Sequence, residues 1–597
     1  MEPAQENDKK KISSLISWLK KIIASFSSKE TRIFKILVVV AVLSGGAFLW
    51  GVHRASLEIV PAHGGSFAEG IVGTPRFINP LLAVSDADRD ITALVYSGLM
   101  RLTSDDLLIP DLAETYTVSP NGLTYTFTLR KNIFFHDRSP VTSDDVLFTI
   151  LKTQENAIKS PRRASWDGVS IKTDGPNTVI FTLKQPYAPF LENTTLGILP
   201  KHIWESVGTE QFSLSQLNIS AIGSGPYQIK KITKNAAGIP EQATLSSFKK
   251  FVLGAPYIST MTIKFYPNEQ DLLLAYQSRS VDGISAVPPS LAETLSKNGK
   301  RIETSPLPRV FGVFFNQNQQ PLFANAAVRH ALNTVTDRKQ IIRDVLHGYG
   351  TPLLGPLPAV SLGYREVNEK QINQDETSRK ADAISVLTKD GWKPNPKDGV
   401  LEKKTKKGTM RLAFSIATSD IAELKQAAEM LKKMWEEIGA QVTLQIFEIG
   451  DLNQNIIRPR KYDALFFGEI IGRDADPFAF WHSSQRLDPG LNIALYANIA
   501  TDKLLEEART LSEKQKRVAK YQAFQNAVAE DIPAVFTYAP EFIYVIPYGI
   551  KGFSMGSITV PADRFASVYN WYIETDHVWK IFTKHKDTGD KIKTASL

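Results

Sequence analysis

The sequence predicts a mixed α/β protein that follows one membrane-spanning helix. Residues 123–129 alternate apolar side chains with threonine, which predicts a half-buried strand. A strand at residues 410–416 precedes an amphipathic helix at 421–438, which Gly439 ends. A second strand follows at 441–447, so the two strands are expected to be parallel. Strands and helices mix without any period of about 20–50 residues, which argues for an α/β fold and against a solenoid.

The membrane-spanning helix is predicted from Ile33 to Val52. This stretch is apolar apart from Lys35, whose side chain can extend to the lipid headgroups. A hydrocarbon core of about 30 Å needs roughly 20 helical residues, so the stretch is just long enough to cross. A buried core helix is the alternative, but a helix this apolar on every face would need a large domain around it. Residues 1–32, which precede it, are polar and rich in lysine.

Charge predicts the orientation of this helix. Residues 1–35 carry eight basic and four acidic side chains, a net +4 out of the formal +8 of the whole chain. Positive flanks stay in the cytoplasm, so the N-terminus is expected inside and the rest outside the cell membrane, as a single-pass protein. A cleaved signal peptide is the rival, but Phe48-Leu49-Trp50 makes a poor cleavage site. The chain has no cysteine for lipidation, so we expect an uncleaved anchor.

The segments on either side of the membrane-spanning helix, and the end of the chain, are expected to lie outside the α/β fold. Residues 1–32 predict a basic amphipathic helix that lies on the inner leaflet or binds a partner, and the sequence does not separate these two uses. Residues 53–65 are expected to form a linker, and the polar residues beyond Thr575 a frayed end.

Zero cysteine excludes disulfides, thiolate metal sites and cysteine nucleophiles. Because half of the net charge belongs to the membrane flank, the basic balance does not indicate a nucleic-acid partner.

Further elements follow from local signals. Residues 178–183 alternate like the first strand. Thr142 with Asp145 three residues later predicts the start of a helix by a capping box. One long helix is expected over residues 325–346, stopped by Gly348.

Several motifs keep the order found in one protein family. They are Asn79-Pro80, 124–130 (TYTFTLR), 135–146 (FHDRSPVTSDDV), 222–227 (IGSGPY), Phe315-Asn316, 328–332 (VRHAL) with Asp337-Arg338, Gly391-Trp392, Asp476-Pro477 and 481–483 (WHS). From about residue 66 to 570 the chain therefore resembles the family 5 extracellular solute-binding proteins, the dipeptide- and oligopeptide-binding receptors of ABC importers.

The resemblance implies a type II periplasmic-binding-protein fold, in which two α/β lobes joined by a hinge close over a ligand between them. The boundaries it implies are residues 66–108, 220–305 and 538–597 for lobe I, 109–219 for a domain inserted in that lobe, and 306–537 for lobe II.

No catalytic constellation is evident. Residues 223–226 (GSGP) have the wrong spacing for a nucleophile elbow and are expected to form a tight turn. His136-Asp137 has no second histidine at ligand spacing, so we interpret it as turn chemistry before the capped helix. We therefore expect no enzyme activity, no cofactor and no metal site.

In peptide-binding members of the family the ligand docks as an added strand through its backbone. Many of them have a tryptophan seven residues before the proline that matches Pro477, and an aspartate four before it that pairs with the peptide's amino terminus. This chain has Ile470 and Arg473 there. Arg473 would repel an ammonium group and attract a carboxylate or phosphate. Asp474 or, less directly, Glu469 could replace the missing aspartate, or Arg473 and Asp474 could pair with each other.

The expected ligand contacts come from two segments. They are Val72, Gly73, Thr74 and Arg76 from lobe I, and Glu469, Ile470, Ile471, Gly472, Arg473 and Asp474 from lobe II.

Three functions remain open from the sequence. The first is an anchored monomeric receptor that passes oligopeptides to the permease of an ABC transporter. The second keeps that role for a nickel chelate, an opine-like compound or an anionic solute, because of Arg473. The third is a sensor or enzyme of the cell envelope, although residues 1–32 leave no room for a signalling domain.

Overall fold

The computed structural model describes residues 14, 17–18, 20–364, 373–406, 408–472, 476–511 and 513–579. The chain forms two compact units. The first joins Met1–Ala62 to Glu574–Leu597, and the second is His63–Ile573.

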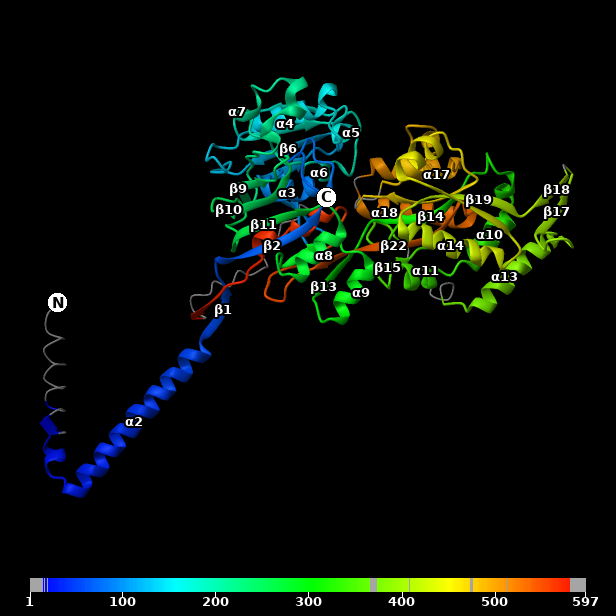
Figure 1. The fold of residues 1–597 in the computed structure, drawn as a ribbon. Coiled ribbons are helices and arrows are strands. Elements are labelled where there is room, and N and C mark those ends of the chain that lie inside the picture. The colour runs from blue at the N-terminus through cyan, green and yellow to red at the C-terminus, as the bar shows by residue number, and fades with distance from the viewer. Residues whose placement is uncertain are drawn as a thin grey trace. The chain divides into compact units, whose positions relative to one another are not determined.

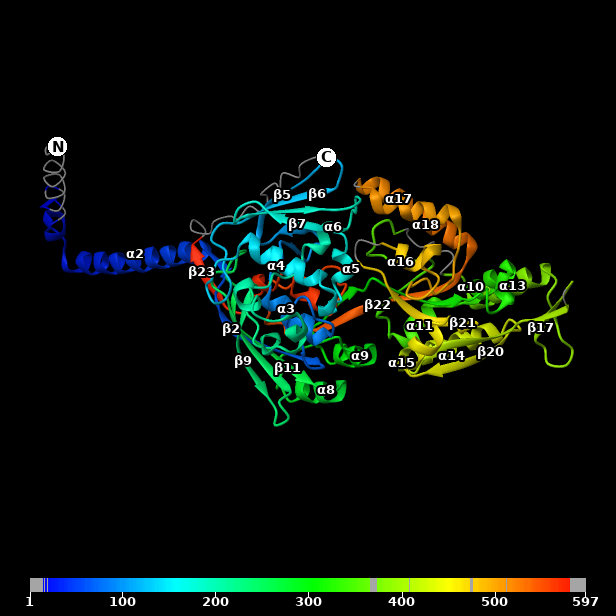
Figure 2. The same ribbon diagram turned by 90° about the horizontal axis from the view of Figure 1, so that it is seen from above.

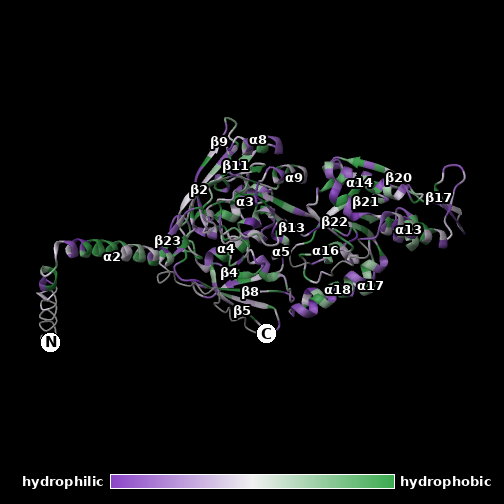
Figure 3. Ribbon diagram, turned by 90° about the horizontal axis from the view of Figure 1, so that it is seen from below, coloured by the Kyte–Doolittle hydropathy of each residue, from purple (hydrophilic) through white to green (hydrophobic). Residues whose placement is uncertain are grey.

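The first unit contains a long apolar helix, α2 (Ser28–Ala55). Ser27 caps it, since its hydroxyl accepts from the backbone N–H of Glu30 and the Glu30 carboxylate accepts from the backbone N–H of Ser27. No residue of the helix is buried, and Figure 3 shows it hydrophobic along most of its length. By length and composition α2 can cross a membrane, a property that anchors and signal sequences share. Of the amphipathic helix predicted before it, Ile12, Leu15, Ile16 and Leu19 lie outside the described residues.

The segments next to α2 differ from the prediction. Residues 53–65 were expected to be a linker, but 53–55 continue α2 and Leu57–Pro61 form strand β1. Residues 575–579 were expected to be frayed and were assigned to lobe I, but they form β23 (Thr575–Trp579), which pairs antiparallel with β1 in the first unit. No local pattern predicts this pairing, because its two strands lie at opposite ends of the chain.

The second unit is built on one twelve-stranded sheet among its described residues (Figures 1 and 2). Its strands, in spatial order, are β20 (Gln441–Phe447), β19 (Ala413–Ser419), β21 (Ala464–Ile470), β14 (Arg309–Phe315), β22 (Ala534–Val545), β12 (Gly283–Ser285), β2 (Gly64–Val72), β11 (Ile258–Tyr266), β10 (Pro240–Ser247) and β9 (Tyr227–Lys234), with β13 (Ile302–Pro306) and β15 (Gly350–Pro352) also on β22.

Strand β22 belongs to both lobes. Its first half pairs with β14 and β15, and its second half pairs with β13 and β12. The chain passes from β13 to β14 beside it, so two segments connect the lobes. These two segments form the hinge between the lobes that the family resemblance implies.

Helices cover both faces of the sheet in each lobe. In lobe I, α3 (Asp86–Val95) packs in the larger core, and α8 (Glu269–Gln277) and α9 (Pro289–Lys297) pack in the smaller one. In lobe II, one core holds α10 (Ala326–Val335), α11 (Arg338–Val345), α13 (Glu376–Lys389) and α14 (Ala422–Glu436), and the other holds α16 (Phe478–Trp481), α17 (Ile499–Thr510) and α18 (Lys514–Asp531). A short hairpin sheet, β16 (Lys393–Pro394), β17 (Leu401–Thr405) and β18 (Gly408–Arg411), precedes β19.

The inserted domain has its own antiparallel sheet and core. The strands are β5 (Ala113–Val118), β6 (Thr124–Leu129), β8 (Thr178–Thr182) and β7 (Ser170–Thr173), and helix α4 (Ser143–Gln154) packs on them. The predicted start of α4 is confirmed, since Asp145 Oδ2 accepts from the backbone N–H of Thr142 at 2.8 Å. The hairpin β3 (Met100–Leu102) and β4 (Leu108–Pro110) leads into this domain.

Two local predictions in lobe II have different outcomes. The parallel pairing of β19 with β20 around helix α14 is confirmed. The single helix predicted over 325–346 is wrong, because it is two helices, α10 and α11. Thr336 ends the first by leaving helical geometry, and the Asp337 side chain caps the second by accepting from the backbone N–H of Gln340 at 2.9 Å.

Candidate ligand-binding site

The lobe I segment predicted to contact ligand follows directly on β2. Val72 is exposed at the end of that strand, and Gly73 turns the chain with φ of +93°, a region that favours glycine. Arg76 is exposed and its guanidinium lies 5.1 Å from the centre of the Phe77 ring. The backbone N–H groups of Arg76 and Phe77 both donate to Asp88 Oδ1, at 2.7 and 2.8 Å. Helix α3 therefore holds this loop in place.

The lobe II segment continues from β21. Ile470 is exposed and stands opposite Arg309 in the antiparallel pair of β21 with β14. Paired residues present their side chains on one face of a sheet, so Ile470 and Arg309 share a face. Ile471 is buried in the lobe II core, and its backbone N–H donates to Pro308 at 2.8 Å. Gly472 is exposed, and Arg473 and Asp474 lie outside the described residues.

Glu469 faces the other way. It stands opposite Val310, on the face that packs into the lobe II core, and is 3% exposed. Neither carboxyl oxygen has a hydrogen-bond partner among the described residues. Burial raises the pKa of Glu469 well above its ordinary value, because an apolar core disfavours the charged carboxylate. A carboxyl that is turned into this core is not positioned to pair with the amino terminus of a peptide in the cleft.

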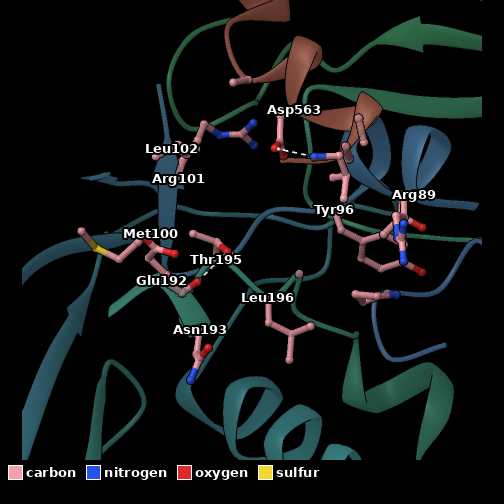
Figure 4. A pocket seen from close by; sticks show the side chains of 18 of the residues that line it. Arg89, Tyr96, Met100, Arg101, Leu102, Glu192, Asn193, Thr195, Leu196 and Asp563 are labelled. Carbon is pink, nitrogen blue, oxygen red and sulfur yellow. Dashed lines mark hydrogen bonds between the residues drawn. The ribbon is translucent and has the colours of Figure 1, made fainter. Parts of the chain in front are cut away.

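A pocket of about 390 Å³ lies where lobe I meets the inserted domain (Figure 4). One wall comes from α3, which contributes Arg89 and Thr92 and continues to Tyr96, and another from β3 with Arg101. The remaining walls come from the inserted domain and from the loop that follows β22. Their residues are Arg162, Ser165, Trp166, Glu192, Asn193, Thr195, Leu196, Gly197, Thr559, Val560, Ala562, Asp563, Phe565 and Ala566.

The charged groups of this pocket differ in how well they are paired. Arg101 Nε donates to the buried Asp111 at 2.8 Å, and Arg101 Nη2 donates to Ser97 at 3.2 Å. Arg89 has a single long contact, 3.5 Å from Nη1 to Asp86 Oδ1, and its Nε is buried without an acceptor. No motif or spacing in the sequence marks Arg89 or Arg162, because the two residues lie far apart in the chain.

Two motifs considered for catalysis are structural. Gly223 and Gly225 press against the end of α3, where the backbone N–H of Gly225 donates to the Val95 carbonyl at 2.8 Å. His136 holds the same turn, since its backbone N–H donates to the Gly223 carbonyl and its Nε2 lies 3.1 Å from the Gly225 carbonyl. Burial lowers the pKa of His136 to about 4, so it is neutral at pH 7. Within the part of the chain that the structure describes, no three His, Asp or Glu side chains gather as a metal site.

Comparison with known proteins gives consistent matches. Residues 108–488 match the family described as bacterial extracellular solute-binding proteins, family 5 Middle. The chain is 29% identical over 502 residues to the oligopeptide-binding protein AppA of Bacillus subtilis, an alignment that covers 83% of this chain and 89% of that protein. It is 25% identical over 515 residues to the dipeptide-binding protein of Escherichia coli, with 81% and 90% covered.

Two solved structures of solute-binding proteins also match this chain. The structure of Bacillus subtilis AppA in complex with a nonapeptide superposes with a TM-score of 0.65 at 27% identity, and covers 86% of this chain and 100% of that chain. NikZ from Campylobacter jejuni in complex with Ni(L-His) gives a TM-score of 0.67 at 25% identity, with 85% and 99% covered.

Proposed function

Because the chain belongs to the bacterial extracellular solute-binding proteins of family 5, we propose that it is a membrane-anchored receptor that captures oligopeptides and delivers them to an ABC permease. The resemblance predicted from the sequence is confirmed by the family match, and the two-lobed fold by the solved structures. The coarser role, a substrate receptor of a peptide or nickel ABC importer, follows from the relatives. The peptide cargo, the anchor, the permease partner and the monomeric state are the proposal.

The observation that carries the peptide cargo is the likeness to AppA, which extends over most of both chains and includes a structure with a bound nonapeptide. The proposed contacts are the loop after β2 and the end of β21. They are Val72, Gly73, Thr74, Arg76, Ile470, Gly472, Arg473 and Asp474. An extended peptide would bind these segments mainly through its backbone, which tolerates many side chains.

Calorimetric titration of the full chain in detergent with a mixed library of free peptides would test the cargo. We expect saturable heat that disappears when the library is digested to amino acids. No heat with any peptide, together with heat on adding another class of solute, would contradict the peptide cargo and leave the receptor role standing.

The anchor rests on α2, on the absence of cysteine and on the positive charge before the helix. Tethering keeps a receptor near its permease and raises the effective concentration there. Fractionation of cells and sequencing of the mature N-terminus would test it. We expect the intact chain in the membrane fraction. A chain that starts after about residue 55 and is free in the medium would refute the anchor.

A second cargo is supported by one relative. NikZ carries a nickel–histidine chelate, and it matches as well as AppA does in fold. Since the described residues offer no cluster that could hold a bare metal ion, nickel would arrive here as a chelate. The sequence-based candidate for an anionic cargo is Arg473. An Arg473→Ala variant should lose affinity for anionic solutes, and unchanged affinity for every ligand found would count against that role.

A further inference from the structure

The pairing of β1 with β23 places a tryptophan from the far end of the chain beside the end of helix α2 (Figure 2). Trp579 stands opposite Leu57, just after the helix ends. The centre of its ring lies 5.2 Å from the centre of the His53 ring. At the other end of the two strands, the backbone N–H of Ala62 donates to the Glu574 carbonyl at 3.0 Å. Backbone hydrogen bonds and a ring contact therefore hold Trp579 at the last turn of α2.

The last turns of α2 carry side chains that are typical of a membrane surface. Trp50 is 63% exposed, and the Arg54 guanidinium lies 5.3 Å from the centre of its ring. His53 and Arg54 follow Trp50 at helical spacing, so the three side chains share one face of the helix. Tryptophan is enriched where lipid meets water, because its ring is apolar and its N–H is polar. Through His53, Trp579 joins this face.

The depth of Trp579 follows from the position of His53 in the helix. The apolar stretch of the proposed membrane span ends at Val52. A helix rises about 1.5 Å per residue, so His53 lies within about 2 Å of the hydrocarbon boundary. The headgroup layer beyond that boundary is about 5–7 Å thick on each side of a bilayer. A ring in contact with His53 therefore lies inside the headgroup layer.

The ribbon of β1 and β23 has one mainly apolar face and one acidic face. Directly paired residues present their side chains on the same face, and neighbours along a strand alternate. The first face carries Leu57, Ile59, Pro61, Thr575, His577 and Trp579. The second face carries Glu58, Val60, Asp576 and Val578. Ile59 is 63% exposed and Trp579 is 38% exposed, so the described residues leave much of the first face open.

The lipid surface is the partner that these observations favour for the open face. A two-stranded ribbon is only marginally stable by itself in water, so an apolar face on it gains from being covered. The pair of Leu57 and Trp579 is continuous with the proposed membrane span, and the two carboxylates of the ribbon stand on the opposite face. Headgroups and upper acyl chains cover an indole ring and still leave its N–H a hydrogen-bond partner.

We propose that the Trp579 ring inserts into the headgroup layer of the outer leaflet, on the side of α2 that carries Trp50. Strand β23 is then a second segment of the chain held at the membrane. This inference rests on the proposed anchor and extends it, because it gives the end of the chain a lipid contact of its own.

The contact affects how the second unit is tethered. Residues 63–573 are joined to the first unit at both ends, through Ala62 and Glu574, and these two residues are hydrogen-bonded to each other. A body attached through two paired strands has fewer orientations than one attached through a single flexible linker. Fewer free orientations lower the entropy that docking on a permease costs.

The test measures the depth of single labelled positions in the full chain, in nanodiscs of phosphatidylcholine. The chain has no cysteine, so each introduced cysteine takes one fluorescent dye without further change. Quenching is compared between lipids with a nitroxide on the headgroup and lipids with a nitroxide in the middle of the acyl chain. The labelled variants are Trp579→Cys, the matched control Asp576→Cys on the acidic face of the same strand, Leu43→Cys within α2, and Leu214→Cys at an exposed site of the inserted domain.

We expect the headgroup nitroxide to quench the dye at residue 579 about twofold or more over the dye at residue 576, and to leave the dye at residue 214 unquenched. The acyl-chain nitroxide should quench the dye at residue 43. In chains labelled at His577→Cys, Trp579→Ser should reduce the headgroup quenching. Trp579→Tyr should retain it, because tyrosine shares the interfacial preference of tryptophan.

The position in α2 separates this inference from the anchor. If the dye at residue 43 is quenched from the acyl chains, but the dyes at residues 579 and 576 are quenched equally or not at all, the anchor stands and the insertion of Trp579 is overturned. Quenching at residue 577 that Trp579→Ser leaves unchanged overturns the role of the ring. A dye at residue 43 that no lipid nitroxide quenches shows that α2 does not span the bilayer, and the anchor then fails together with the inference.

Discussion

The buried charge network around Arg564 should be essential for lobe I. Arg564 is fully buried and lies between Glu69 on β2 and Asp90 on α3. Its Nη2 is 2.5 Å from Glu69 Oε1 and 2.6 Å from Asp90 Oδ2, and its Nη1 donates to Asp90 Oδ1 at 2.8 Å. The hydroxyl of Tyr544 on β22 donates to Glu69 Oε2 at 2.7 Å. The network therefore links β2, α3 and β22, and the loop proposed to contact ligand follows directly on β2.

Replacing Arg564 with methionine keeps a long apolar side chain but leaves two buried carboxyls without their cation. Removing one partner of a buried ion pair costs about 3–5 kcal/mol, and Arg564 serves two partners, so we expect a loss near 5 kcal/mol in the free energy of unfolding. Burial already raises the pKa of Glu69 and of Asp90 above their ordinary values. Carboxyls with raised pKa values cost stability as pH rises, so the loss should be larger at pH 8 than at pH 5.

Urea unfolding of the full chain in detergent, followed by tryptophan fluorescence, would measure this loss. Trp571 reports on the right region, since it packs on Phe67 and Phe565 in the lobe I core. The variant that combines Arg564→Met with Glu69→Gln and Asp90→Asn should recover most of the stability, because no buried charge is left unpaired. A single Arg564→Met variant within about 1 kcal/mol of the parent at both pH values would refute the reasoning.

Three further predictions concern pH and packing. Because the pKa of His136 falls to about 4, the unfolded chain takes up a proton first on acidification, and stability should fall between about pH 6.5 and 4. In His136→Gln the melting temperature should depend less on pH over that range. Unlike Glu69, which pairs with Arg564, Glu469 has a raised pKa and no counter-charge among the described residues. Glu469→Gln should therefore gain stability relative to the parent as pH rises above about 4.5, and equal gains at pH 4 and 8 would contradict this. A Cβ at Gly223 would lie 2.1 Å from the Val95 carbonyl, so Gly223→Ala should cost about 1–3 kcal/mol or more, whereas Gly208→Ala, with open space, should cost less than about 1 kcal/mol by the same unfolding assay.

Local sequence signals were sufficient where the structure depends on neighbours in the chain. The strand at 441–447 is observed with the predicted bounds, and the Thr142–Asp145 signal does begin a helix. Each of these features follows from periodicity or from a cap within a few residues. The same reasoning failed at residues 336–337, where Thr336 leaves helical geometry and the Asp337 side chain caps a second helix within an otherwise continuous apolar pattern.

The sequence by itself determined the apolar helix, the α/β class and the ordered motifs, because each depends on composition or on short-range spacing. Only the tertiary structure decided that Leu57–Pro61 pairs with Thr575–Trp579, that Glu469 faces a core, and that Arg89 and Arg162 line one pocket. These facts depend on which distant segments the fold brings together and on which face of a strand is covered.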